Sequence, residues 1–162
     1  MGAIIKLDAV NHMLLMAGES MVSDLEENSG LDTETSEFIL DQFIRDFQMR
    51  GLANNRYIEK YTLDDAGQIV LPSETISAEL ISYHANTDGY RIIGTARGNT
   101  TKILWNVTDQ TDSWPSGTEW RCEIIRAITW DDMDTPVQRA ILSSSARQYQ
   151  LVTQGDGYAD SY

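Results

Sequence analysis

The chain has 162 residues, 41% of them hydrophobic, with 12 basic and 25 acidic residues and a net charge of -13. This length suits one domain, or one domain with an insertion, and the acidic balance argues against tight binding of nucleic acid through its phosphates. The lone Cys122 excludes an internal disulfide, and no apolar run approaches the roughly 20 residues that a membrane span needs.

Two helices are predicted in the first third of the chain. Residues 7–17 carry apolar side chains at helical spacing and end before Gly18. Residues 33–50 show a stronger apolar stripe, with acidic residues in the first turns, and end before Gly51. The polar residues 19–32 between them are predicted to form a loop.

From about residue 56 to residue 128 the apolar side chains alternate, which predicts antiparallel strands with short connections. The strands expected on this basis are 57–63, 67–72, 90–95, 101–107 and 119–130. Residues 77–84 are ambiguous between strand and helix. The segment ARGN, 96–99, is expected to be a hairpin turn. In the last strand one side should carry Trp120, Cys122, Ile124 and Arg126.

Helical signals return after the acidic stretch TWDDMDTPVQRAI. The segment Thr135-Pro136-Val137-Gln138 matches a capping box with proline at the first helical position. With the preceding aspartate, the predicted helix cap comprises Asp134, Thr135, Pro136 and Gln138. The helix should continue to Gln154 and stop at Gly155. DDMDTP lacks the glycine and the spacing of a calcium loop, so the acidic stretch is interpreted as the turn before this helix.

These elements predict an α+β protein. The helical part comprises residues 1–55 and 130–162, so a small helical bundle is built from both ends of the chain. The antiparallel β-sheet subdomain, residues 56–129, is inserted between them.

The sequence predicts no catalytic, cofactor-binding or metal-binding residue. His12 and His84 are the only histidines, and neither lies in a zinc protease motif. Cys122 lies among apolar residues in the middle of a strand and is predicted to be a small core residue. A carboxylate pair for glycoside hydrolysis stays open as an alternative, because two such acids need not be close in the sequence.

Five segments, in order along the chain, resemble the family of tail tubular protein A, the head-to-tail adaptor of short-tailed bacteriophages. They are AVNHMLLMAGESMVSDLE, the Arg50-Gly51 helix end, Leu71-Pro72 after a strand, NVTDQTDSWPSG, and EIIRAITWDDMDTPVQRAILSSSARQY. The residues that carry the resemblance are Asn11, Gly18, Glu19, Arg50, Gly51, Pro72, Asp109, Asp112, Gly117, Arg126, Asp132, Met133, Arg147 and Gln148. Family members usually continue beyond the last segment with a further acidic helical segment, where this sequence departs.

The resemblance implies a non-enzymatic structural protein without cofactor, located in the virion tail and, during assembly, in the host cytoplasm. Its expected partners are eleven further copies in a ring, the portal protein, the tail nozzle (tail tubular protein B) and the tail fibre, with no membrane. DNA is expected to pass through the ring without tight binding, since twelve copies carry -156 in total. The rival from another class is a virion-associated cell-wall (peptidoglycan) hydrolase.

Overall fold

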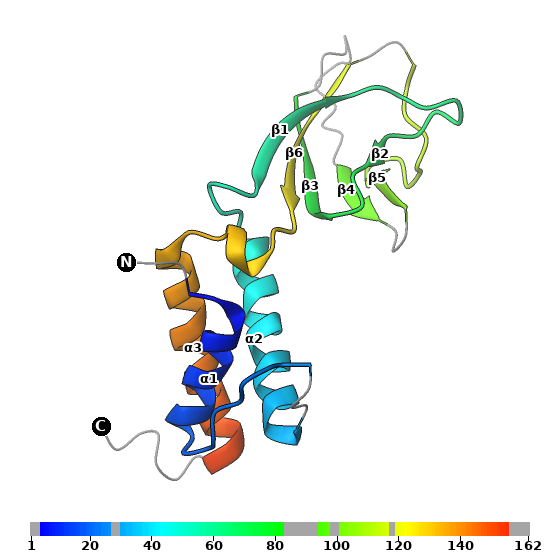
Figure 1. Ribbon diagram of the computed structural model, residues 1–162. Helices are drawn as coiled ribbons and strands as arrows, with labels where there is room; N and C mark the ends of the chain where they lie inside the picture. Colours follow the sequence, from blue (N-terminus) through cyan, green and yellow to red (C-terminus); the bar gives the residue numbers. More distant parts are fainter. Residues whose placement is uncertain (1–3, 27–29, 83–93, 98–100, 117–118, 156–162) are drawn as a thin grey trace. The chain divides into compact units, whose positions relative to one another are not determined.

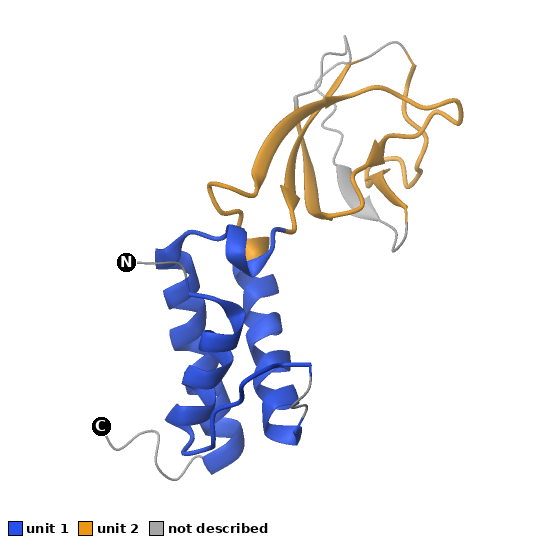
Figure 2. Ribbon diagram, viewed as in Figure 1, with its two compact units in different colours: residues 1–47, 128–162 blue, residues 48–127 orange. Residues whose placement is uncertain are grey.

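The computed structural model describes residues 4–26, 30–82, 94–97, 101–116 and 119–155, with helices at both ends of the chain and strands between them (Figure 1). This arrangement confirms the predicted α+β class. The chain divides into two compact units (Figure 2). The helical unit comprises residues 1–47 and 128–162, and the β unit comprises residues 48–127. Within the described part of the chain, no helix is long and apolar enough to cross a membrane.

The helical unit contains α1 (Lys6–Met16), most of α2 (Leu31–Met49), the 3-10 turn η1 (Trp130–Asp132) and α3 (Thr135–Gln154). All three α-helices were predicted, because each has an apolar face and a glycine just beyond its end. Gly18, Gly51 and Gly155 all have positive φ angles, between 74° and 82°. The buried core residues are Ala9, Val10, Met13, Leu14, Ile39, Leu40, Trp130, Met133, Ile141, Ala146 and Tyr149.

The end of α1 is fixed by a Schellman motif and by a side-chain amide. The backbone N–H of Glu19 donates to the carbonyl of Leu14 at 2.9 Å, and that of Gly18 to Leu15 at 3.0 Å. The Asn11 amide then holds the following loop. Its Nδ2 donates to the Val22 carbonyl at 2.9 Å, and its Oδ1 accepts from the Val22 N–H at 2.8 Å. The polar loop after α1 therefore lies against the helix.

The start of α3 agrees with the prediction in its position and in the places of Asp134 and Pro136, but not in the capping box. The helix begins at Thr135 and its N-cap is Asp134, with no side-chain hydrogen bond at the cap, so the predicted capping box does not form. Gln138 is instead fully buried. Its Nε2 donates to the Trp130 carbonyl at 2.9 Å and to the Ile4 carbonyl at 3.2 Å, while its Oε1 accepts from the Ile4 N–H at 3.2 Å. The amide satisfies buried backbone groups, which outweighs its role at an exposed cap.

The described residues of the β unit form two antiparallel sheets of three strands. The first has the order β1 (Arg56–Tyr61), β6 (Trp120–Arg126), β3 (Thr75–Ser82). The second has the order β2 (Val70–Leu71), β5 (Lys102–Asn106), β4 (Gly94–Arg97). Their shared core consists of Ile69, Leu71, Ala78, Leu104, Trp114, Trp120, Cys122 and Ile124. The Trp114 and Trp120 rings meet edge to face, with centroids 4.8 Å apart.

Several strand predictions need correction. The ambiguous segment 77–84 contributes to β3, which starts earlier, at Thr75. The strand expected over 67–72 is reduced to Val70–Leu71. Ala96 and Arg97, expected in a hairpin turn, belong to β4 and pair with Leu104 and Ile103. Most of the expected strand 90–95, and residues 98–99 of the turn, lie outside the described residues.

We predict that Asn11→Ala lowers the free energy of unfolding by about 2–3 kcal/mol, because it removes two hydrogen bonds and leaves the backbone groups of Val22 without partners. Urea unfolding followed by circular dichroism measures the change. The control is Gln148→Ala, an exposed position on α3 where a loss within about 0.5 kcal/mol is expected. Equal stability of the two variants would show that the loop is not held by Asn11.

Candidate functional site

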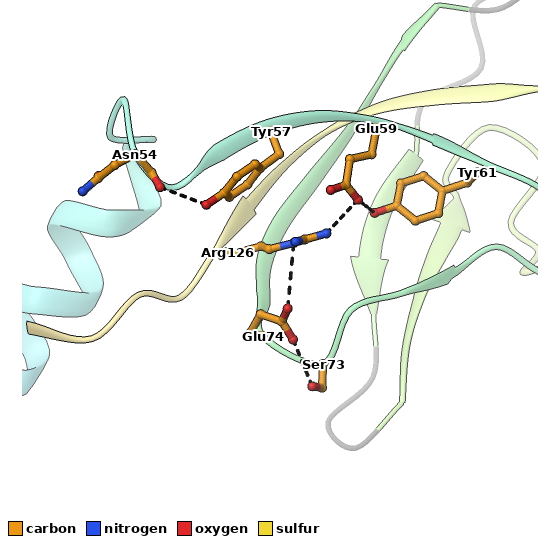
Figure 3. A network of polar contacts seen from close by, with 7 residues as sticks. All are labelled: Asn54, Tyr57, Glu59, Tyr61, Ser73, Glu74 and Arg126. Carbon is orange, nitrogen blue, oxygen red and sulfur yellow. Dashed lines mark hydrogen bonds and ion pairs between the residues drawn. The ribbon is translucent and has the colours of Figure 1, made fainter. Parts of the chain in front are cut away.

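Arg126 is the centre of a polar network in the β unit (Figure 3). Its Nη2 lies 2.7 Å from Oε2 of Glu59, and its Nε lies 3.9 Å from Oε1 of Glu74. Its guanidinium carbon is 5.0 Å from the centroid of the Tyr57 ring. The strand register explains this meeting. Glu59 pairs with Cys122 and Tyr57 with Ile124, so both share the face on which Arg126 falls by alternation.

Two further groups complete the network. The Tyr61 hydroxyl donates to Oε2 of Glu59 at 2.8 Å, and burial together with this carboxylate raises the pKa of Tyr61 to about 12. The Ser73 hydroxyl donates to Oε2 of Glu74 at 3.1 Å. The pKa of Glu74 is lowered, first by the hydrogen bond from its own backbone N–H and then by the one from Ser73. Glu74 is therefore a carboxylate at neutral pH.

This arrangement is unlike the acid pair of a glycosidase. Such enzymes need one carboxylic acid whose pKa is raised, so that it can protonate the leaving group. Here one guanidinium lies between Glu59 and Glu74, and the pKa of Glu74 is shifted downwards. The geometry serves to tie β1, β6 and the residues preceding β3 to one another.

The loop after β5 is a second ordered polar cluster. Asn106 is fully buried, and its side-chain amide donates to Asp109 at 2.8 Å and accepts from the Asp109 N–H at 3.0 Å. Asp112 accepts a 2.6 Å hydrogen bond from the side chain of Gln68. The Trp114 indole N–H donates to the Leu104 carbonyl at 2.9 Å. The acidic residues of this loop thus define its shape and connect it to the strand that follows Gly67.

The acidic stretch before α3 forms a turn. Asp131 and Asp132 lie in η1, where the Thr129 hydroxyl donates to the Asp132 carboxylate at 2.7 Å, and Met133 is buried in the helical core. Among the residues that the structure describes, no group of three or more His, Cys, Asp or Glu is placed to hold a metal ion. Cys122 is fully buried in the β core, as predicted, and burial raises its thiol pKa to about 12, so the thiol has little nucleophilic character.

The turn after α2 explains the Arg50-Gly51 motif. A Cβ on Gly51 would lie 2.5 Å from Nη2 of Arg56, and that nitrogen donates to the Arg50 carbonyl at 3.3 Å. Asn55 is fully buried below this turn. Its Oδ1 accepts from the Leu52 N–H at 2.6 Å, and its Nδ2 donates to the Gln48 carbonyl at 3.3 Å.

The residues that carry the family resemblance do not form one cluster. Gly18 and Glu19 close the end of α1 and Asn11 holds the loop after it, while Asp109 and Asp112 lie in the loop after β5. The carbonyl of Pro72 accepts from the N–H of Thr75 in the turn into β3. Arg147 and Gln148 are exposed on α3, and Gly117 lies outside the described residues. Most of these residues therefore hold turns and loops in place.

A groove of about 520 Å³ runs between α1 and α3 in the helical unit. Its polar lining includes His12, Arg139 and Arg147, and its apolar lining includes Met16, Leu142 and Ala146. Among the described residues, the lining contains no Asp or Glu, although the sequence of the helical unit has 15 acidic residues and only 4 basic ones, a net charge of -11. The β unit has 10 acidic and 8 basic residues, a net charge of -2.

The sequence alone did not identify the groove or the partners of Arg126. The alternation of apolar residues placed Arg126 correctly on the same face as Trp120. No sequence pattern indicated that β1 pairs with β6, which is the pairing that brings Glu59 next to Arg126. The two arginines of α3, eight residues apart, were a detectable signal for the groove, because a spacing of about two turns places them on one side of a helix.

We predict that Arg126→Met lowers the free energy of unfolding by about 1 kcal/mol at neutral pH through loss of the half-buried Glu59 pair. The folded pKa of Glu74 is lowered first by its own backbone N–H and by Ser73, and least by Arg126, so Arg126 supplies only a small part of this stabilisation. That part is present above the unfolded value of 4.5 and is lost as the pH falls below it. The difference from wild type should therefore shrink in acid. Lys60→Met, which removes an exposed pair with Glu119, is the control and should cost less than about 0.5 kcal/mol.

Comparison with known proteins gives one family. The family model described as "Tube: Tail tubular protein" matches residues 7–158, which include nearly all of both compact units. Comparison with curated proteins gives no match. The match spans far more than half of the chain, and the chain belongs to the tail tubular protein family, the structural proteins of phage tails.

Proposed function

We propose that this chain is a tail tubular protein of type A, the head-to-tail adaptor of a short-tailed phage. The observation that carries the proposal is the order of the motifs within the family match. Five segments that resemble the type A proteins occur in sequence inside residues 7–158. In the described structure most of their residues hold turns and loops, which is what an adaptor made of fixed surfaces requires.

In this proposal twelve copies form a ring. The helical unit meets the portal protein and neighbouring copies, and the β unit meets the nozzle, tail tubular protein B, and the tail fibre. A ring closes when each subunit offers two different surfaces to its neighbours. It then presents many weak contacts to the portal at once, so that docking is avid. The protein would be present in the host cytoplasm until it joins the virion tail.

The distribution of charge supports passage of DNA without tight binding. The helical unit carries -11 of the total charge of -13, so in a ring the negative charge is concentrated on one part of each subunit. Exposed carboxylates that face a channel repel the phosphate backbone, and no clustered cations hold it. We propose that these carboxylates belong to the helical unit.

The first test is the mass of the purified chain, measured by light scattering, alone and mixed with the portal ring of the same phage. We expect a complex with about twelve copies of the chain per portal, because the portal arranges the docking surfaces in a ring. Absence of association in both samples would overturn the adaptor assignment. A mixture of the chain with an unrelated ring protein of similar charge serves as the control for non-specific binding.

The second test concerns the charge. Virions in which Asp8, Asp46 or Asp131 is replaced by Lys, one exposed acid from α1, α2 and η1 in turn, should eject DNA more slowly if the position faces the channel. Replacement by Asn separates loss of repulsion from gain of attraction. Ejection kinetics unchanged in all three Lys variants would contradict the acidic channel.

A further inference from the structure

The helical unit carries two exposed surfaces of complementary chemistry. One is the groove between α1 and α3, defined by His12, Met16, Arg139, Leu142, Ala146 and Arg147. The other is a stripe on α2, defined here as Leu31, Glu34, Phe38 and Gln42 and called the α2 stripe. All four residues of the stripe are exposed, Leu31 to 78% and Phe38 to 62%.

The α2 stripe faces away from the core of its own unit. Its positions are separated by three or four residues, which places them on one side of the helix. The buried residues Thr33, Ser36 and Leu40 lie on the opposite side. Leu31 and Phe38 leave apolar area in water on the same side of the helix, and it is such shared exposed area, not a single exposed residue, that marks a contact surface. Glu34 beside it makes the N-terminal half of the stripe acidic.

The groove has the opposite sign. It is lined by two of the four basic residues of a unit that has fifteen acidic ones. A third, Lys6, forms ion pairs with Glu37 at 3.1 Å and Asp41 at 3.0 Å on the side of α2. The apolar side chains of Met16, Leu142 and Ala146 lie beside the arginines. The groove can therefore receive an apolar side chain flanked by a carboxylate, which is the chemistry of Phe38 with Glu34.

We propose that the α2 stripe of one copy docks in the α1–α3 groove of the next copy, with Phe38 against Met16, Leu142 and Ala146 and Glu34 toward Arg147. The inference rests on the proposed ring and names the surfaces that build it. Because the two surfaces lie on different helices of one unit, the contact is head-to-tail, as a closed ring requires. Two identical surfaces would instead give a dimer that stops growing.

The test uses two full-length variants, each defective in one surface. Arg147→Glu reverses the charge of the groove, and Phe38→Asp removes the apolar side chain of the stripe. Each alone should need at least about tenfold more protein to assemble, on the portal or free, than the wild type. Mixed together they retain one intact pair of surfaces, and should form a heterodimer that grows no further. Placing Glu34→Arg and Arg147→Glu in the same chain should restore assembly.

Two matched controls come from α3. Gln148→Glu is the control for Arg147→Glu, because it adds a negative charge next to Arg147 but outside the groove. Val152→Asp is the control for Phe38→Asp, because it replaces an apolar residue that is 57% exposed and lies on α3 instead of α2. Both should assemble as the wild type does. Circular dichroism and thermal unfolding establish that every variant is folded. Should Arg147→Glu or Phe38→Asp fail to fold, the milder Arg147→Gln and Phe38→Ala replace them, with the same direction of effect.

The outcomes separate the inference from the proposed function. A wild-type ring that forms together with normal assembly of both surface variants would overturn the inference and leave the adaptor assignment intact. Defective single variants whose mixture gives no heterodimer would show that the two surfaces do not meet each other, which also overturns it. A wild type that forms no oligomer, alone or on the portal, overturns the adaptor assignment and the inference together.

Discussion

The fold depends on a few side-chain amides that join the two ends of the chain. The helical unit is built from residues 1–47 and 128–162, so its halves must meet across an 80-residue insertion. Gln138 bonds to both backbone groups of Ile4, and the Trp130 indole donates to the Ile4 carbonyl at 2.6 Å. At the other end of α3, Gln150 and Gln154 donate to the carbonyls of Met16 and Ala17. These bonds offset the entropy lost in closing so long a loop.

Side-chain amides also hold the turns in place. Asn11 and Asn55 each satisfy one backbone donor and one backbone acceptor with a single side chain. Asn106 accepts from the backbone N–H of Asp109 and donates to its carboxylate. An asparagine amide offers a donor and an acceptor in the geometry of a peptide group, so it continues backbone hydrogen bonding where the backbone itself turns away. A chain with only one cysteine gains loop order in this way.

The helices were predictable because their signals are local. The apolar face and the glycine that follows each helix lie within a few turns of one another, and α1, α2 and α3 appear close to the expected bounds. The strand pairings depend on partners distant in sequence, so the order β1-β6-β3 and the ion pair of Arg126 with Glu59 could not be predicted. For Gln138 the local sequence pattern gave a wrong prediction. Its local pattern indicated a cap, but the approach of Ile4, 134 residues away, gives its amide buried partners instead.

The packing of the helical unit also determines what a neighbouring copy can do. The proposed groove and stripe lie on helices joined by one core and by the Lys6 pairs with Glu37 and Asp41. The angle between the two surfaces is therefore a property of one packed unit, and a densely packed interior resists deformation. In a head-to-tail contact that angle determines the rotation from one copy to the next. The amides that close the chain ends would then set the geometry of the ring as well as the stability of the monomer.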